Sequence, residues 1–183
     1  MTASIESFKI AGFRVKAVGN VEELLAKIRG LAGGLSFQVF DAERLAGRRH
    51  LEVAALHAIS AFKAGCNVSR SLGMEAAVYA SCQRQIGRAL EAVGVKPETK
   101  AIAVLVFGEG EVEGFLERLS LELGWVRDDT VLDGWESRLG SLLKAYGISA
   151  EEFEAAREAL GLEEAEVFLR LLWERMGLLA AKV

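Results

Sequence analysis

The seven residues from Ala101 to Phe107 are all apolar and include two valines. A strand with one wet face alternates apolar and polar side chains, so an unbroken apolar run predicts a strand that is buried on both faces. Such a strand lies in the middle of a sheet and needs a layer of other elements on each side. The chain must therefore supply more strands, and enough helices to cover both faces of a sheet.

Three shorter stretches are predicted as further strand. Apolar residues occupy even positions in residues 7–10 and odd positions in residues 13–17, a period of two that indicates strand in each case. The phase slips by one residue between these stretches, so we predict a bulge or a tight bend at Gly12. Residues 36–41 form another short strand.

Helical patterns fill most of the remaining chain. Before the last third they cover residues 21–31, 48–64, 71–82, 83–93 and 112–123. The last third is predicted to be helical throughout: residues 133–146, a helix that begins with a capping box of Ser149 and Glu152, and residues 163–182. The predicted fold class is α/β, a small mixed β-sheet flanked by helices on both faces with a helical C-terminal third. We expect a single domain over residues 1–183, in which an α/β core (1–127) carries a packed helical extension (128–183).

Charge and cysteine content bound the environment of the protein. The formal net charge is −4, but residues 42–100 carry nine Lys and Arg against five Asp and Glu, a net charge of +4. This central region could face phosphate, or it could simply be a solvated surface. Cys66 and Cys82 form no CxxC pair and are predicted to be free thiols. No signal pattern or run of 18 apolar residues occurs, so we expect a cytoplasmic protein without membrane contact.

Two patterns could carry chemistry, and for each we favour a structural interpretation. Gly108, Gly110 and Gly114 follow a buried strand and precede a helix, as in a nucleotide-binding turn. The glutamates between these glycines would repel a phosphate, so we predict a turn that begins a helix. His50 and His57 have no nearby ligand set for a metal, so we predict packing roles. No metal, cofactor or catalytic residue is predicted.

The region 67–88 is rich in groups that suit RNA. Guanidinium groups bind phosphate, and amides and hydroxyls bind splayed bases. The candidate RNA contacts are Arg70, Arg84, Arg88, Asn67, Ser71, Gln85 and, from the preceding helix, Arg49. The alternative is a solvated helix face with capping residues, in which Ser71 begins the helix that follows.

Two helices in the middle of the chain are apolar on more than one side. Residues 48–64 and 71–82 therefore lie deep in the fold or are covered by a partner protein. Candidates for partner or core burial are Val53, Leu56, Met74 and Tyr79. A structural alternative, that these helices lie between the sheet and the C-terminal helices, explains the pattern equally well.

The same region resembles a known family. Residues 67–75 read NVSRSLGME and residues 79–86 read YASCQRQI. They resemble the patterns N-I-S-x-S-L-x-x-E and L-Y-x-S-G-x-R-Q-I of the PRPK-binding (TPRKB-like) accessory subunit of the KEOPS complex, in its archaeal type. Residues 37–42, the pair His57-Ala58 and the leucine-rich residues 169–179 extend the similarity along the chain. Cys82 stands where the family usually has glycine.

The resemblance implies a non-catalytic accessory subunit of the complex that makes the tRNA threonylcarbamoyladenosine modification. Such a subunit binds and activates a small protein-kinase-like ATPase, contacts other KEOPS subunits indirectly, and recruits tRNA through its single-stranded acceptor end. Two alternatives remain from the residues themselves. One is a protein-interaction module without RNA affinity, and the other is a small nucleotide-binding enzyme that uses the turn at Gly108.

Overall fold

The computed structural model describes residues 7–181 and contains one four-stranded sheet. The strand order is β2-β3-β1-β4, and each pairing is antiparallel. The apolar run forms β3 (Ala101–Phe107), which lies between β2 (Ser36–Asp41) and β1 (Phe8–Arg14). The two-residue strand β4 (Val126–Arg127) pairs with the outer edge of β1. The predicted central strand is confirmed.

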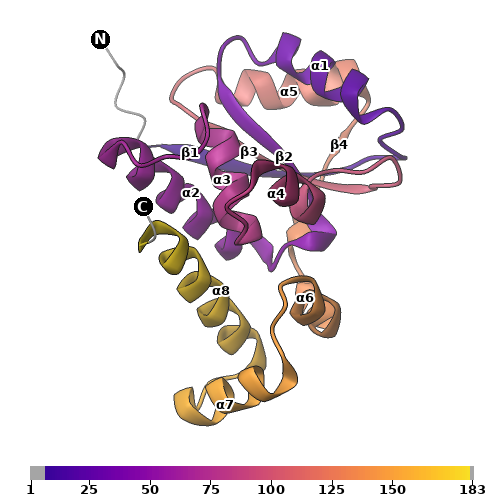
Figure 1. Ribbon diagram of the computed structural model, residues 1–183. Helices are drawn as coiled ribbons and strands as arrows, with labels where there is room; N and C mark the ends of the chain where they lie inside the picture. The colour runs from indigo at the N-terminus through magenta and orange to yellow at the C-terminus, as the bar shows by residue number, and fades with distance from the viewer. Residues whose placement is uncertain (1–6, 182–183) are drawn as a thin grey trace.

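Helices cover both faces of this sheet (Figure 1). On one face, α1 (Val21–Leu31) and α5 (Val112–Leu123) pack on side chains that include Val104 and Val106 of β3. On the other face, α2 (Gly47–Ala64) and α3 (Leu72–Ser81) pack on a core that includes Leu105 and Phe107. Successive side chains of β3 thus enter two different cores, which is why the strand has no polar position. The α/β class with helices on both faces is confirmed.

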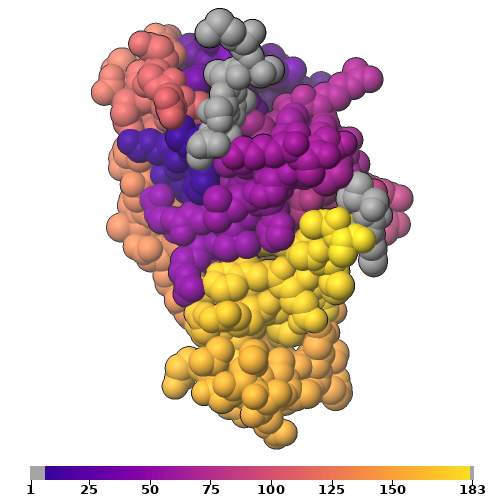
Figure 2. Space-filling view, turned by 90° about the vertical axis from the view of Figure 1, so that its left-hand side faces the viewer, coloured from indigo at the N-terminus to yellow at the C-terminus, as the bar shows by residue number. Residues whose placement is uncertain are grey.

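The C-terminal third is helical, as predicted. Its elements are η2 (Asp129–Leu132), η3 (Trp135–Arg138), α6 (Leu139–Ala145), α7 (Ala150–Leu160) and α8 (Glu164–Ala181). The short helix η1 (Ala42–Arg44), which follows β2, contacts η2. The predicted end of the last helix at Lys182 lies outside the described residues. Helix α8 packs beside α2 (Figure 2). Its Phe168, Leu172 and Met176 are fully buried in the core that α2 and α3 share. The remaining helix, α4 (Ile86–Val93), packs on α3.

The predicted bulge at Gly12 is wrong. Strand β1 pairs with β3 without interruption, from Phe8 opposite Phe107 to Arg14 opposite Ala101. The change of phase has another cause: β1 places apolar side chains in both cores, one on each face of the sheet. Ile10 enters the core beneath α2, whereas Phe13 enters the core beneath α1 and α5. Both faces of the strand are buried at its middle, so apolar residues appear at even and then at odd positions.

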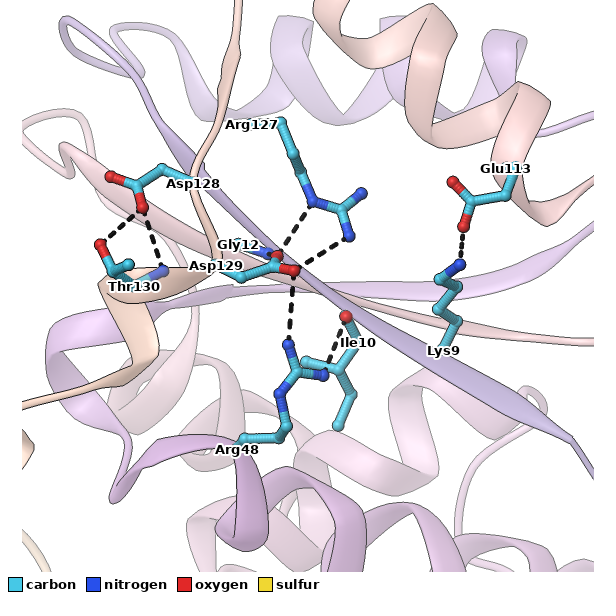
Figure 3. A network of polar contacts seen from close by, with 9 residues as sticks. All are labelled: Lys9, Ile10, Gly12, Arg48, Glu113, Arg127, Asp128, Asp129 and Thr130. Carbon is cyan, nitrogen blue, oxygen red and sulfur yellow. Dashed lines mark hydrogen bonds and ion pairs between the residues drawn. The ribbon is translucent and has the colours of Figure 1, made fainter.

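The joint between the sheet and the C-terminal helices is held by a polar network (Figure 3). The backbone N–H of Gly12 donates to Asp129 Oδ1 at 2.7 Å, and Arg127 donates to the same carboxylate. From α2, Arg48 donates to the carbonyl of Ile10 at 3.1 Å and lies 3.7 Å from Asp129 Oδ2. These contacts attach η2 to β1 and α2, and so position the start of the C-terminal helices on the sheet.

Candidate functional site

The loop between α2 and α3 is organised around the buried carboxylate of Glu75. This carboxylate accepts hydrogen bonds from the backbone N–H of Val68 at 3.0 Å and of Ser69 at 2.7 Å. The Asn67 amide donates to the Ser69 carbonyl, and the Ser69 hydroxyl donates to the carbonyl of Ser71. A charged acceptor that satisfies two backbone donors gives strong hydrogen bonds, so the motif of residues 67–75 has a structural explanation.

Ser71 and Cys82 mark the two ends of α3. The Ser71 hydroxyl accepts from the backbone N–H of Met74 at 3.3 Å, so the predicted N-cap is confirmed. Cys82 ends the helix in a left-handed conformation with φ 55°, which a glycine would adopt without strain. Two residues among the candidate RNA contacts thus have partners nearby: Asn67 bonds within the loop, and Ser71 bonds to the first turn of α3.

Helix α3 lies against β2 at very close range. A Cβ atom added to Gly73 would meet the carbonyl oxygen of Phe37 at 2.0 Å, and the Gly73 N–H donates to the hydroxyl of Ser36. The small side chains Ala76, Ala77 and Ala80 are fully buried on the same helix. Only small residues allow two backbones to approach this closely, which explains the composition of the helix.

The candidate arginines do not form a single cluster. Arg84 and Arg88 are exposed on either side of the start of α4, and Gln85 lies exposed between them. Arg70 is exposed at the opposite end of α3, which is about 15 Å away along a ten-residue helix. Helix α3 itself is largely buried and has no basic residue. We name the exposed groups at its two ends, Arg70 at one and Arg84, Gln85 and Arg88 at the other, the basic stretch.

Arg49 lies apart from this stretch, on α2. Its Nη1 is 2.8 Å from Glu166 Oε2 of α8, and its guanidinium stacks over the ring of Trp173 at 5.0 Å. Arg170 also pairs with Glu166, and its guanidinium carbon lies 5.4 Å from the centroid of the Trp173 ring, which is a second cation–π contact. The pKa of Glu166 is lowered, chiefly by its hydrogen bond from Arg49. Sequence reasoning missed the α8 residues of this cluster because Arg49 and Glu166 lie 117 positions apart, and no local pattern indicates that they meet.

The candidates for partner or core burial divide between surface and core. Leu56 on α2 is 54% exposed, and Val53 and Met74 are partly buried. Tyr79 is 3% exposed and its ring stacks on His57 with 5.0 Å between ring centroids, so packing in the core accounts for it. We name the outer side of α2 and α8, formed by Arg49, Val53, Leu56, Glu166, Arg170 and Trp173, the α2/α8 surface. The two helices lie side by side in Figure 2.

Both histidines pack within the fold, as predicted. His50 is fully buried; its Nδ1 accepts from the backbone N–H of Ala46 at 3.0 Å, and its Nε2 donates to the carbonyl of Ala80 at 2.8 Å. These two contacts fit the neutral ring, and burial lowers the pKa of His50 to about 4. Burial also lowers the pKa of His57. Among residues 7–181, no group of three or more His, Cys, Asp or Glu side chains could hold a metal ion.

The glycine-rich turn after β3 begins a helix, as predicted. Gly108 and Gly110 have φ of 127° and 92°, and α5 starts at Val112. Glu109 and Glu111 are exposed at this turn.

Both cysteines are free thiols, as predicted. In the described part of the chain, every helix is too short or too polar to cross a membrane.

Taken together, the fold and its surface define a small α/β binding protein, with a helical face that combines an exposed Leu, Arg side chains and a partly buried Trp. Comparison with known proteins identifies the family. Residues 15–160 match the family model described as kinase binding protein CGI-121, so the chain belongs to this family. The regulatory protein Cgi121 of Methanocaldococcus jannaschii is 31% identical over 116 residues, which are 58% of this chain and 73% of that protein. The resemblance to the TPRKB-like family is confirmed.

Proposed function

We propose that this chain is the accessory subunit of an archaeal, cytoplasmic KEOPS complex. It binds and activates the small protein-kinase-like ATPase of that complex and brings tRNA to it, without catalysing a step itself. Membership of a kinase-binding family is the observation that carries this proposal. The regulatory name of the archaeal relative supports it. The chemistry on tRNA then belongs to other subunits.

The α2/α8 surface is our proposed kinase-binding face. Trp and Arg are enriched at the energetically important positions of protein interfaces, and charged residues gather at the rim. The Trp173 ring makes cation–π contacts with two arginines, Arg49 and Arg170. On the neighbouring helix, Leu56 offers an exposed apolar side chain. Val53 extends the same side of α2 by one turn.

Leu56→Glu tests this face. We expect the variant to lose capture of the kinase-like ATPase in a pull-down and to lose stimulation of its ATPase activity, because a buried unpaired carboxylate is costly at an interface. The matched control is Leu121→Glu, which places the same charge on α5, in the opposite layer, at a leucine that is 81% exposed. Equal binding by both variants would contradict the proposed face while leaving kinase binding itself intact.

The basic stretch at the two ends of α3 is our proposed tRNA-binding face. Arg70, Arg84 and Arg88 supply phosphate contacts, and Gln85 supplies an amide for base contacts. Arg84→Glu with Arg88→Glu should weaken tRNA binding and flatten its dependence on salt. Lys16→Glu with Lys27→Glu is a matched control, since both lysines are exposed outside residues 42–100. A gel shift with tRNA that has or lacks the acceptor end measures both effects.

A protein-interaction module without RNA affinity is the second candidate function. The observation in its favour is that the Asn67 amide and the Ser71 hydroxyl form hydrogen bonds within their own chain, to Ser69 and Met74. Kinase capture together with unshifted tRNA at low salt would establish this function in place of the first. The same gel shift therefore separates the two candidates.

A further inference from the structure

A cavity of about 350 Å³ lies where η1 and the loop before β3 face helix α6. Three cationic side chains line it: Arg44 from η1, Lys100 from the loop, and Arg138 from the end of η3. Within residues 7–181, none of the three forms an ion pair with a carboxylate. The cavity therefore brings together cations from three separate segments without neutralising them by direct contact.

Arg138 is the most informative of these residues. Its Nε and Nη2 atoms are shielded from solvent and have no hydrogen-bond acceptor among the described residues. These two nitrogens lie along one edge of the planar guanidinium, and that edge binds a carboxylate or phosphate through two parallel hydrogen bonds. Buried charged donors without an acceptor lower the free energy of unfolding, so the unpaired edge of Arg138 destabilises the folded protein.

The acidic residues of the wall limit what this cavity can attract. The Asp41 carboxylate is already engaged, because it accepts from the Thr99 hydroxyl and from the backbone N–H of Glu43, each at 3.0 Å. Glu43 and Glu98 are exposed and balance part of the positive charge. A wall with both signs suits a small ligand whose anionic group meets Arg138 and whose hydroxyl or amino groups meet the glutamates.

We propose that this cavity binds a small organic anion through a phosphate or carboxylate group, which accepts both hydrogen bonds from the Nε and Nη2 edge of Arg138. Arg44 and Lys100 supply the remaining positive charge. Because the edge is shielded, the Arg138 side chain turns toward the cavity as the ligand enters. The bound ligand connects η1 of the sheet layer to α6, so it stabilises the docking of the C-terminal helices.

Thermal unfolding of the whole chain in sodium phosphate or sodium acetate tests this site, with sodium chloride holding the ionic strength constant. A ligand that binds only the folded state stabilises it by RT ln(1 + c/Kd), where c is the ligand concentration, so the melting temperature rises with the logarithm of c once c exceeds Kd. We expect at least one of the two anions to do so, and the stronger of them identifies the anionic group. Arg138→Gln should weaken the apparent affinity about tenfold or more, given the strength of charged hydrogen bonds.

Two further variants guard against a folding defect at Arg138. Arg44→Gln and Lys100→Gln change exposed side chains, and each should weaken binding severalfold. Lys16→Gln, which removes a charge elsewhere on the surface, should bind like the unmodified chain. The proposal is overturned if neither anion raises the melting temperature, or if the cavity variants and Lys16→Gln respond alike. These results do not depend on the kinase or on tRNA.

Discussion

The carboxylate of Glu75 accepts a 2.7 Å hydrogen bond from the backbone N–H of Ser69, six residues earlier in the chain. Glu75 sits in the first turn of α3 and is fully buried, and it also accepts from Val68. A single side chain thus holds the loop that precedes its own helix. The loop in turn fixes where Arg70 stands at the end of the proposed tRNA-binding face.

Replacement of Glu75 by alanine should destabilise the protein by about 3 kcal/mol. The change leaves two backbone N–H groups without their acceptor, and each costs on the order of 1–3 kcal/mol where it stays shielded from water. Urea unfolding measures the effect. Glu91→Ala, on the exposed side of α4, should change stability by less than about 0.5 kcal/mol. Similar losses in both variants would show that the carboxylate does not hold the loop.

His50 should make the stability of the protein fall in mild acid. Its pKa is about 4 in the folded state and ordinarily 6.5, so the unfolded chain binds more protons between these values. Stability is fully present above about pH 6.5, falls as the pH decreases, and has lost about 3 kcal/mol near pH 4. Urea unfolding at a series of pH values measures this slope.

His50→Gln is the matched variant, because an amide can also donate to the Ala80 carbonyl and accept from Ala46. Its stability should depend less on pH between 6.5 and 4. A shallower slope remains, since the lowered pKa of His57 acts with the same sign. Carboxylates with lowered pKa values, such as Glu166, lose their contribution at lower pH, as they become protonated below the usual range. An unchanged slope in His50→Gln would assign the acid sensitivity elsewhere.

Cys82 should react slowly with alkylating reagents in the folded protein. Burial raises the pKa of its thiol to about 12, and only the thiolate is nucleophilic. At pH 8 this reduces the thiolate fraction roughly 10³-fold relative to an ordinary cysteine. Mass spectrometry after brief treatment with iodoacetamide measures the modification at Cys82, and the same protein in urea is the control. Rapid modification without urea would contradict the raised pKa of the Cys82 thiol.

How far the sequence predicts this molecule depends on whether a feature is local. The strand at Ala101–Phe107 and the cap at Ser71 follow from short patterns, because burial on both faces and capping each leave a local signature. The pairing of Arg49 with Glu166 joins residues 117 positions apart, and no local pattern encodes it. The cavity at Arg138 likewise arises only when three distant segments meet. Sequence reasoning thus found the core and loop motif but not the cavity.

Gly12 shows the same limit, since its role depends on a distant segment. The backbone of η2 crosses β1 at this residue, and a Cβ atom here would meet the carbonyl oxygen of Asp128 at 2.4 Å. The carbonyl of Gly12 also accepts from the backbone N–H of Asp128 at 2.9 Å, so the two backbones are bonded as well as close. The change of phase in the sequence pointed to Gly12 as a bulge, whereas the structure needs glycine there because η2 lies so close.

Gly12→Ala should therefore destabilise the protein by about 2–4 kcal/mol, because the added methyl group must push η2 away from β1. Gly30→Ala is the control: it lies within α1, has no atom within 4 Å of an added Cβ, and should be stabilising by about 0.5–1 kcal/mol. Urea unfolding compares the two. Hydrogen exchange locates the damage, and in Gly12→Ala the backbone amides of η2 should exchange faster, since Asp128 and Asp129 lose their contacts with β1. If the amides of η2 keep their protection while stability falls, the strand itself and not the crossing of η2 determines the need for glycine.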